Sequence, residues 1–146
     1  MLREARKEDV PFIVAMLADD ELGRAREQLA DMTPYLRAFD EIAADPHNTQ
    51  YVWDDNGELL GCLQLTIMPG LSQQGAWHAQ VEGVRTVASR RGSGIGRKMM
   101  AAIMAIARQK GCKQMQLLTS KSRVHAQRFY RDLGFEHSHE GMKAKL

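Results

Sequence analysis

The sequence predicts an α/β or α+β domain, and three observations support this prediction. The chain has 146 residues, which suits one domain. Its hydrophobic fraction of 44% and charged fraction of 26% are typical of a globular protein. In the second half, segments with strand-like alternation are interleaved with segments of helical spacing, which favours a sheet with mixed strand pairing. We therefore expect residues 1–146 to form one domain.

The first half of the chain predicts a short strand and two helices. Residues 2–6 are strand-like, and Pro11 suits the first turn of a helix that ends near residues 19–23. Thr33 and Pro34 have the residue types of an N-cap and a first helical position. A second helix is therefore expected over residues 34–44.

A β-hairpin is expected next. Residues 50–54 and 58–68 have strand character and flank an Asn-Gly pair at positions 56 and 57. This pair favours the positive φ angles of a two-residue hairpin turn. Residues 72–75 are polar and predict a loop after the second strand.

The second half predicts a strand, a helix, a strand, a helix and a strand-like tail, over residues 76–88, 95–110, 113–119, 123–132 and 135–146. Gly83 lies inside the first of these strands, where an interior glycine indicates a bulge or a close backbone approach. Gly111 suits the C-terminal cap of the longer helix.

The basic residues are concentrated in one stretch. Residues 84–131 contain 12 Lys and Arg but no Asp or Glu, whereas residues 1–83 contain 6 basic and 15 acidic residues. Such a stretch suits a phosphorylated cofactor or nucleic acid, or it forms a solvated face balanced by the acidic first half. A nucleic-acid-binding domain would interleave aromatic residues with these charges, but only Phe129 and Tyr130 lie there. Nucleic acid is therefore the weaker prediction.

No membrane, disulfide or metal site is predicted. The longest uninterrupted apolar run covers residues 99–107, whereas a membrane-spanning helix needs about 20 residues. The first nine residues are rich in charge, unlike a signal peptide. Cys62 and Cys112 are isolated and form no CxxC pair. These features lead us to expect a cytoplasmic protein.

A glycine-rich loop separates the strand at 76–88 from the following helix. Gly92, Gly94 and Gly96 allow a tight turn, and a helix N-terminus offers free N–H groups and a positive dipole end to an anion. The loop lacks the Lys-Ser/Thr of a Walker motif, and its glycine spacing is not that of the Rossmann fingerprint. Alone, it predicts either a phosphate site or a simple strand-to-helix turn.

Two segments of the chain together resemble the GNAT superfamily of acyl-CoA-dependent N-acyltransferases. Residues 84–96, VRTVASRRGSGIG, are similar to the family's [RQ]-x-x-G-x-[GA] loop and its preceding strand. Residues 126–135, AQRFYRDLGF, are similar to the family's A-x-x-F-Y-x-x-L-G-F segment. The resemblance implies a mixed, twisted, mostly antiparallel sheet of about six or seven strands with helices on both faces. It also implies transfer of an acetyl group from acetyl-CoA to a primary amine by direct attack in a ternary complex.

The resemblance also assigns cofactor-binding residues. The strands at 76–88 and 113–119 would splay apart around the pantetheine arm, and the loop would surround the pyrophosphate. The implied residues are Val84, Arg85, Thr86, Val87, Arg91, Gly92, Ser93, Gly94, Ile95, Gly96 and Arg97, together with Tyr130, which would position the thiol. Arg123 stands where many members of the family carry Asn, and it is a further candidate for a cofactor phosphate.

Three residues are candidates for proton transfer. The resemblance places Tyr130 where a phenol protonates the leaving thiolate, and a phenol with a pKa near 10 keeps its proton at neutral pH. The alternative is a core aromatic whose hydroxyl only finds a hydrogen-bond partner. Glu82 is the only carboxylate among residues 59–131, and it is either a base for the amine or an ion-pair partner of Arg85 or another basic neighbour. His78 is a second candidate base on the same strand face.

The acceptor is expected to be a primary amine of a small molecule or a peptide. Five acidic residues in the region expected to shape its pocket suit a cationic amine, or they form an exposed acidic helix end: Asp19, Asp20, Glu21, Glu27 and Asp31. Homodimers are common in the resembled family, so the sequence is also compatible with a homodimer. A non-catalytic acyl-CoA-binding regulator on the same fold is the alternative to an enzyme.

Overall fold

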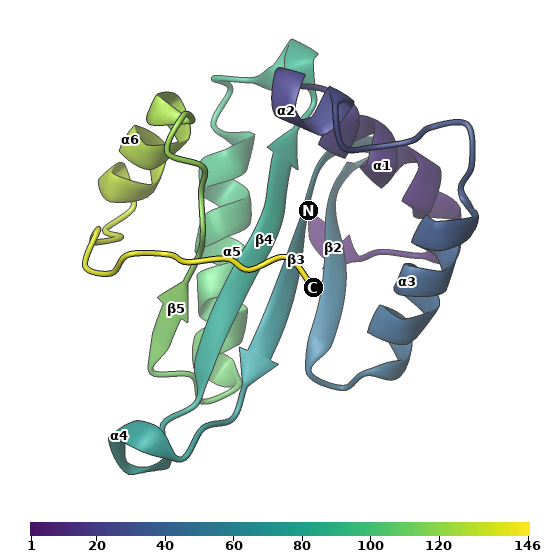
Figure 1. Cartoon of the computed structure of the whole chain (residues 1–146). Helices are drawn as coiled ribbons and strands as arrows, with labels where there is room; N and C mark the ends of the chain where they lie inside the picture. Colours follow the sequence, from purple (N-terminus) through teal and green to yellow (C-terminus); the bar gives the residue numbers. More distant parts are fainter.

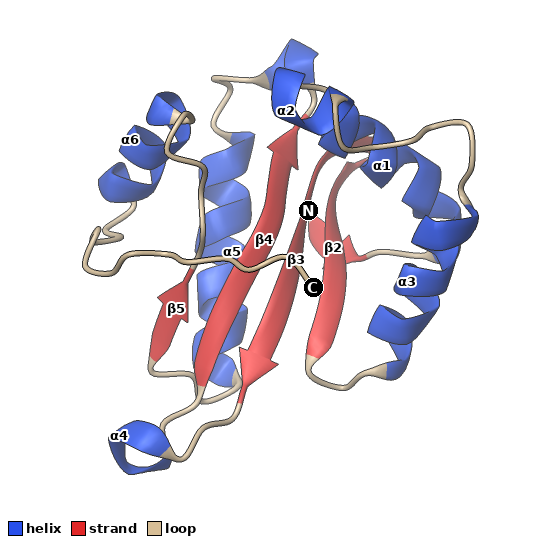
Figure 2. Cartoon of the chain, viewed as in Figure 1, coloured by secondary structure: helices blue, strands red, loops and turns tan.

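The computed structural model describes all of residues 1–146 and has a five-stranded sheet with helices on both faces (Figures 1 and 2). Along the sheet the strands are β1 (Leu2–Glu4), β2 (Asn48–Asp55), β3 (Glu58–Met68), β4 (His78–Thr86) and β5 (Gln114–Gln116). The first four strands pair antiparallel, and β5 pairs parallel with β4. The predicted mixed, mostly antiparallel sheet is thereby confirmed, with five strands where about six or seven were expected.

Six helices and two short 3₁₀ turns connect the strands. They are the turn Lys7–Asp9, α1 (Val10–Ala18), α2 (Glu21–Arg24), α3 (Thr33–Ala44), α4 (Ser72–Gly75), the turn Ala88–Arg90, α5 (Ile95–Gln109) and α6 (Val124–Asp132). Pro11 lies in the first turn of α1, as predicted. In α3 the N-cap is Met32, one residue earlier than the predicted Thr33. No helix has the length and apolar character that crossing a bilayer requires.

The core is divided between the two faces of the sheet, because consecutive strand residues point to opposite sides. On one face, Met99 and Ile103 of α5 pack with Leu63 of β3, and all three are fully buried. On the other face, α1 contributes Ile13 and Met16 to a smaller cluster that contains the cross-strand neighbours Val52 and Cys62. In Figure 2, α5 accordingly lies behind the sheet, opposite α1.

Two local features of the sheet match the sequence prediction. Asn56 and Gly57 have φ angles of 54° and 93° and join β2 to β3, so the predicted hairpin turn is confirmed. In β4, Gly83 has a φ of 60°, and the register between β3 and β4 shifts between Cys62 and Gln64. This shift is the bulge that the interior glycine predicted.

Three segments differ from the expectation. Residues 72–75, expected to be a loop, form one irregular turn in which Gln73 and Gln74 have left-handed φ angles of 52° and 63°. The strand expected over 113–119 is limited to Gln114–Gln116. The strand-like tail at 135–146 forms no strand: its backbone makes no ladder with β5, and residues 136–146 are exposed.

Strands β4 and β5 separate partway along β4. Their pairing runs from His78 opposite Gln114 to Gln80 opposite Gln116 and ends there. Beyond this point β4 continues to Thr86 with no strand on that side, while it remains paired with β3 on the other. The divergence that the family resemblance implied is therefore present, and it leaves backbone hydrogen-bonding groups of β4 facing an open side.

Candidate active site

The glycine-rich loop forms the N-terminus of α5. Gly94 is the N-cap residue, with a φ of 87°, and Gly92 has a φ of 78°. A Cβ atom at either position would meet nothing within 4 Å, so the backbone conformation and not lack of space accounts for glycine here. The predicted strand-to-loop-to-helix unit is confirmed.

The backbone N–H groups at this helix end are free. Those of Gly94, Ile95, Gly96 and Arg97 donate to no acceptor within the protein, and the first internal bond there joins Lys98 N–H to Gly94 O. Since these groups also lie at the positive end of the helix dipole, the loop has the chemistry of a phosphate site. The arrangement thus fits the pyrophosphate that the family resemblance implies.

The cationic side chains of the loop have partners elsewhere in the chain. Arg91 donates from Nη2 to Oδ2 of Asp19 at 2.7 Å and to its carbonyl oxygen at 3.1 Å. Arg90 lies 4.0 Å from Glu58. Arg97 is exposed and forms no ion pair. An anion at the loop would therefore compete with Asp19 for Arg91.

The loop is in contact with α6 and the end of β4. A Cβ atom at Gly96 would lie 3.4 Å from Cζ of Phe129 and 3.7 Å from Oγ1 of Thr86. The two segments that carry the family resemblance therefore meet in space. Thr86 faces the α5 side of the sheet at this point.

Tyr130 lies one residue beyond Phe129, on the side of α6 that faces β5. Its ring packs edge-to-face against Phe129 and Phe135, with centroids 5.2 and 5.8 Å apart. Burial raises the pKa of Tyr130, and the charges of Arg85 and Arg123 partly oppose this rise. Its hydroxyl forms no hydrogen bond with another group of the protein.

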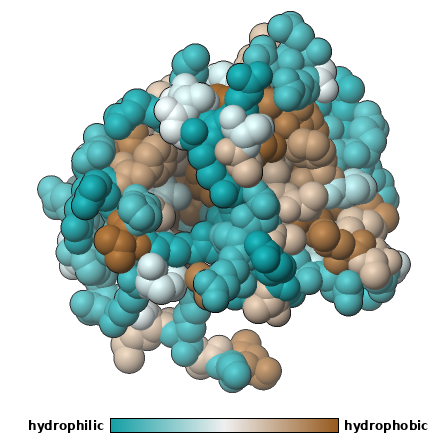
Figure 3. Space-filling view, turned by 90° about the horizontal axis from the view of Figure 1, so that it is seen from above, coloured by the Kyte–Doolittle hydropathy of each residue, from teal (hydrophilic) through white to brown (hydrophobic).

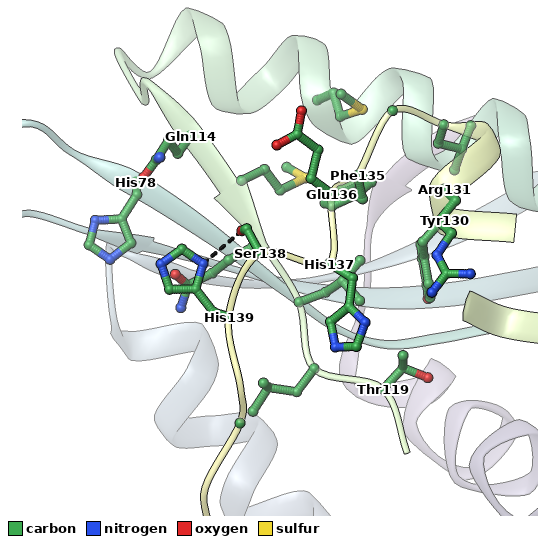
Figure 4. A pocket seen from close by; sticks show the side chains of 18 of the residues that line it. His78, Gln114, Thr119, Tyr130, Arg131, Phe135, Glu136, His137, Ser138 and His139 are labelled. Atoms are coloured by element: carbon green, nitrogen blue, oxygen red, sulfur yellow. Dashed lines mark hydrogen bonds between the residues drawn. The ribbon is translucent and has the colours of Figure 1, made fainter. Parts of the chain in front are cut away.

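A cavity of about 830 Å³ lies between β5, the end of α6 and the C-terminal tail (Figure 4). Met115, Leu117 and Phe135 supply part of its lining, and Tyr130 also lines it. Figure 4 shows His78 and Gln114 on the opposite side of this space from Tyr130. Of the site residues predicted from the sequence, Tyr130 and the candidate base His78 line this cavity, whereas none of the glycine-loop residues does.

Three charged side chains from distant parts of the chain meet near Tyr130. Oδ2 of Asp20 lies 2.7 Å from Nη1 of Arg123 and 3.8 Å from Nη2 of Arg85. Burial raises the pKa of Asp20, but the Gly23 N–H and the two arginines outweigh this and hold it below its usual range. Arg85 also donates from Nη1 to the carbonyl of Val84, and its Nε is buried without a partner.

Glu82 lies away from this group of charges. It is exposed on β4 opposite Gln64, and it forms no ion pair or hydrogen bond with any side chain. The predicted alternative of an ion pair with Arg85 is therefore wrong, because Arg85 is directed to Asp20. Gln80 and His78 follow at alternate positions on the same strand, and Gln80 accepts from Gln116 across the β4–β5 pair at 2.9 Å.

Four of the five acidic residues expected to attract a cationic acceptor have partners within the chain. Asp19 holds Arg91, and Asp20 accepts from the N–H of Gly23 at 2.6 Å while facing Arg123. Glu27 accepts from the hydroxyl of Tyr35. Asp31 similarly caps the start of α3 by accepting from Thr33 N–H. With these partners, the region does not present a cluster of free carboxylates to a cation.

Sequence reasoning missed the part that Asp19 and Asp20 play. Both follow the end of α1, and together they connect the α1–α2 segment to the glycine loop, β4 and α6. The available local signal was the Asp20 N-cap of α2, which gives no information about the arginines.

Other reactive side chains are not assembled into a site. Cys62 is fully buried, and burial raises its pKa to about 12, which disfavours the nucleophilic thiolate. No group of three or more His, Cys, Asp or Glu side chains is placed to hold a metal ion. His125 is exposed on α6.

Comparison with known proteins agrees with this geometry. The sequence model of the acetyltransferase (GNAT) family matches residues 14–135. The aminoalkylphosphonate N-acetyltransferase of Salmonella typhimurium is 28% identical over 141 residues, which cover 94% of this chain and 86% of that protein. The glucosamine 6-phosphate N-acetyltransferase of Trypanosoma brucei brucei is 30% identical over 90 residues, or 62% of this chain and 59% of that protein.

A solved structure matches over the full length. The crystal structure of a transcriptional regulator from Bacillus halodurans C-125 is 44% identical, covers 100% of this chain and 99% of its own, and superposes with a TM-score of 0.96. The family match spans both the glycine loop and the Tyr130 segment. The chain therefore belongs to the GNAT acetyltransferase family.

Proposed function

We propose that this protein is one catalytic domain that transfers an acetyl group from acetyl-CoA to the primary amine of a small molecule. The observation that carries the proposal is the position of Tyr130: its hydroxyl has no hydrogen-bond partner in the protein, and its neighbour Phe129 lies against Gly96 of the glycine loop. Acyl transfer needs a bound thioester, a deprotonated amine and a proton donor for the departing thiolate.

The residues of this chain suit these roles. The free N–H groups at Gly94–Arg97 would bind the pyrophosphate, and the unpaired edge of β4 at Val84–Val87 would hydrogen-bond the pantetheine amides. Tyr130, protonated at neutral pH, would donate its proton to the sulfur as the carbon–sulfur bond breaks. Glu82 would take a proton from the attacking amine, directly or through water.

The named relatives support a small-molecule acceptor. The Salmonella and Trypanosoma proteins are, by name, N-acetyltransferases for an aminoalkylphosphonate and an amino sugar phosphate. Both named acceptors carry an amino group, which is the nucleophile that direct attack on a thioester needs. The sequence analysis also allowed a peptide amine as the acceptor.

The proposal is tested by replacing Tyr130 with Phe. We expect Tyr130→Phe to lower kcat by about 100-fold or more, the usual contribution of a positioned acid, while the Kd for acetyl-CoA stays within about twofold. Tyr51→Phe is the matched control, because it removes a hydroxyl from a buried tyrosine of β2, away from the glycine loop. An unchanged kcat in Tyr130→Phe would remove Tyr130 from the mechanism.

A second function is favoured by one observation, the 44% identity to a protein described as a transcriptional regulator. A non-catalytic regulator would bind acyl-CoA and transfer nothing. Calorimetry with acetyl-CoA and a screen of amines with a free-thiol readout separate the two functions. Thiol release that depends on an amine supports the enzyme, whereas tight acetyl-CoA binding without such release supports the regulator.

A further inference from the structure

We propose that Arg85 and Arg123 form a subsite for a phosphonate or phosphate group carried by the amine acceptor. This inference rests on the proposed function and names the substrate class of the same site. It starts from the charges of the group described above, in which two guanidinium groups share one oxygen of Asp20. The side chains of all three residues are about three-quarters buried, with exposed fractions of 23% to 29%.

The single carboxylate leaves most of the guanidinium donors without acceptors. Oδ1 of Asp20 is committed to the N–H of Gly23 at 2.6 Å, so only Oδ2 faces the arginines. Arg85 has one further acceptor, the carbonyl of Val84, and its buried Nε has none. A buried donor without a partner is costly, and a guanidinium prefers an oxyanion that can accept from several of its N–H groups.

The charge balance points in the same direction. Two cations and one anion leave an excess positive charge in a partly buried site, where screening by water is reduced. A phosphonate or phosphate monoester carries three oxygens and up to two negative charges, so it supplies both the missing acceptors and the missing charge.

The position of the two arginines favours the acceptor over the cofactor. Arg85 pairs with Cys62, whose side chain lies in the α1 cluster, whereas the neighbouring Thr86 contacts the glycine loop side. The Arg85 side chain thus points to the face of the sheet opposite the contact between Thr86 and Gly96. Arg123 is the N-cap residue of α6, the helix that carries Tyr130, so an anion held by the two arginines would lie at the N-terminal end of that helix.

The surface above this site is consistent with a polar entrance. Figure 3 looks down on the end of the molecule that carries α2 and shows hydrophilic residues between two more hydrophobic areas, next to a hollow. Asp20 begins α2 and Arg123 precedes α6, so the two helices that flank this end supply the polar groups. A small anionic amine would reach the arginines by displacing the carboxylate of Asp20.

The test compares matched amines in steady-state kinetics. The probes are 2-aminoethylphosphonate, β-alanine as the carboxylate analogue and propylamine as the uncharged-tail control. We expect the wild-type kcat/KM to be at least about 100-fold higher for the phosphonate than for propylamine, and Arg85→Gln or Arg123→Gln to raise the phosphonate KM by about 10-fold or more. Arg123→Lys should recover part of this loss, because it keeps the charge.

Two further variants separate binding from structure. Asp20→Asn keeps an N-cap residue for α2 but removes the competing charge, so we expect a lower KM for 2-aminoethylphosphonate. Arg108→Gln, at an exposed position of α5, is the control and should leave every KM unchanged.

Each remaining outcome is decisive. Equal kcat/KM values for 2-aminoethylphosphonate and propylamine would overturn the subsite and leave the acetyltransferase in place. A raised KM for acetyl-CoA alone in Arg85→Gln and Arg123→Gln would assign the pair to the cofactor instead. If no amine is acetylated, calorimetry of 2-aminoethylphosphonate in the presence of CoA decides: binding that Arg123→Gln abolishes supports the subsite without the catalytic function, and no binding rejects both.

Discussion

Oδ2 of Asp19 accepts a hydrogen bond from Nη2 of Arg91 at 2.7 Å, so the guanidinium assigned to the cofactor's pyrophosphate is held by a carboxylate of the same chain. Both side chains are about half exposed. The pair joins the end of α1 to the glycine loop, and any phosphate at the loop has to compete with it.

We therefore expect Asp19→Asn to strengthen acetyl-CoA binding. An exposed ion pair contributes about 0.2–1 kcal/mol, so its removal should lower the Kd by a factor of about 1.5 to 5. Isothermal titration calorimetry at low salt is the suitable measurement. Asp40→Asn, which removes another exposed ion pair with Lys7, is the control and should leave the Kd unchanged. Weaker binding in Asp19→Asn would mean that Asp19 positions Arg91 for the cofactor.

The conformation of the glycine loop gives a second prediction. Gly94→Ala forces an alanine to a φ near 87°, which costs about 1–2 kcal/mol of stability or shifts the loop. Since the N–H groups of this loop are the proposed phosphate ligands, the Kd for CoA should rise together with the loss of stability. Gly111→Ala is the matched control, because Gly111 has a φ of 85° at the other end of α5. It should lose comparable stability and bind CoA normally; equal effects of both variants on CoA affinity would argue against a specific role for the loop.

The role of Glu82 is tested by its amide. Glu82→Gln should lower kcat at neutral pH by about 100-fold if the carboxylate accepts the proton of the amine. The effect should shrink at high pH, where the acceptor amine is already deprotonated. Because Glu82 is exposed and has no ion-pair partner, the melting temperature should not change. A full pH–rate profile for both proteins is the measurement, and a profile identical to wild type would assign the base to another group such as His78.

The stability of the protein should depend on pH through Asp9. This residue is 6% exposed, and it accepts two hydrogen bonds from Arg3 and one from the N–H of Arg6. Burial raises its pKa, but these contacts outweigh burial and lower it below the usual value. A carboxylate with a lowered folded-state pKa stabilises the fold above the unfolded pKa, about 3.9, and loses this contribution as the pH falls through the folded pKa.

Urea unfolding at several pH values tests this dependence. Asp9→Asn should cost about 1.5–3 kcal/mol at pH 7, and the difference from wild type should decrease below about pH 4. Glu8→Gln, at a neighbouring exposed position, should unfold like wild type. A cost for Asp9→Asn that stays constant down to pH 3 would show that packing and not charge is responsible.

The features that sequence predicted well depend on residues close together in the chain. The Asn56-Gly57 turn, the bulge at Gly83 and the loop before Ile95 each follow from the backbone preferences of a few neighbouring residues. Local residue preferences also predicted Pro11 in the first turn of α1 and Gly111 after the end of α5.

The features that were missed depend on packing between distant segments. Asp20 and Arg123 meet because α2 and α6 lie at the same end of the sheet, and no local pattern encodes this. The partners of Asp19 and Asp20 were missed for the same reason, because Arg91, Arg85 and Arg123 are distant from them in the chain. The strand expected over 113–119 has the right alternation, but only three of its residues have a partner within reach on β4.

The three residue pairs between β4 and β5 have a consequence for dynamics. A strand held by so few backbone hydrogen bonds opens at a lower free energy than the centre of a sheet, so the amides of β5 should exchange with deuterium well before those of β3. The buried cluster around β2, β3 and α5 does not depend on that edge. The protein can therefore widen or narrow the space beside β4 by local motion of β5 and α6, while the rest of the fold stays in place.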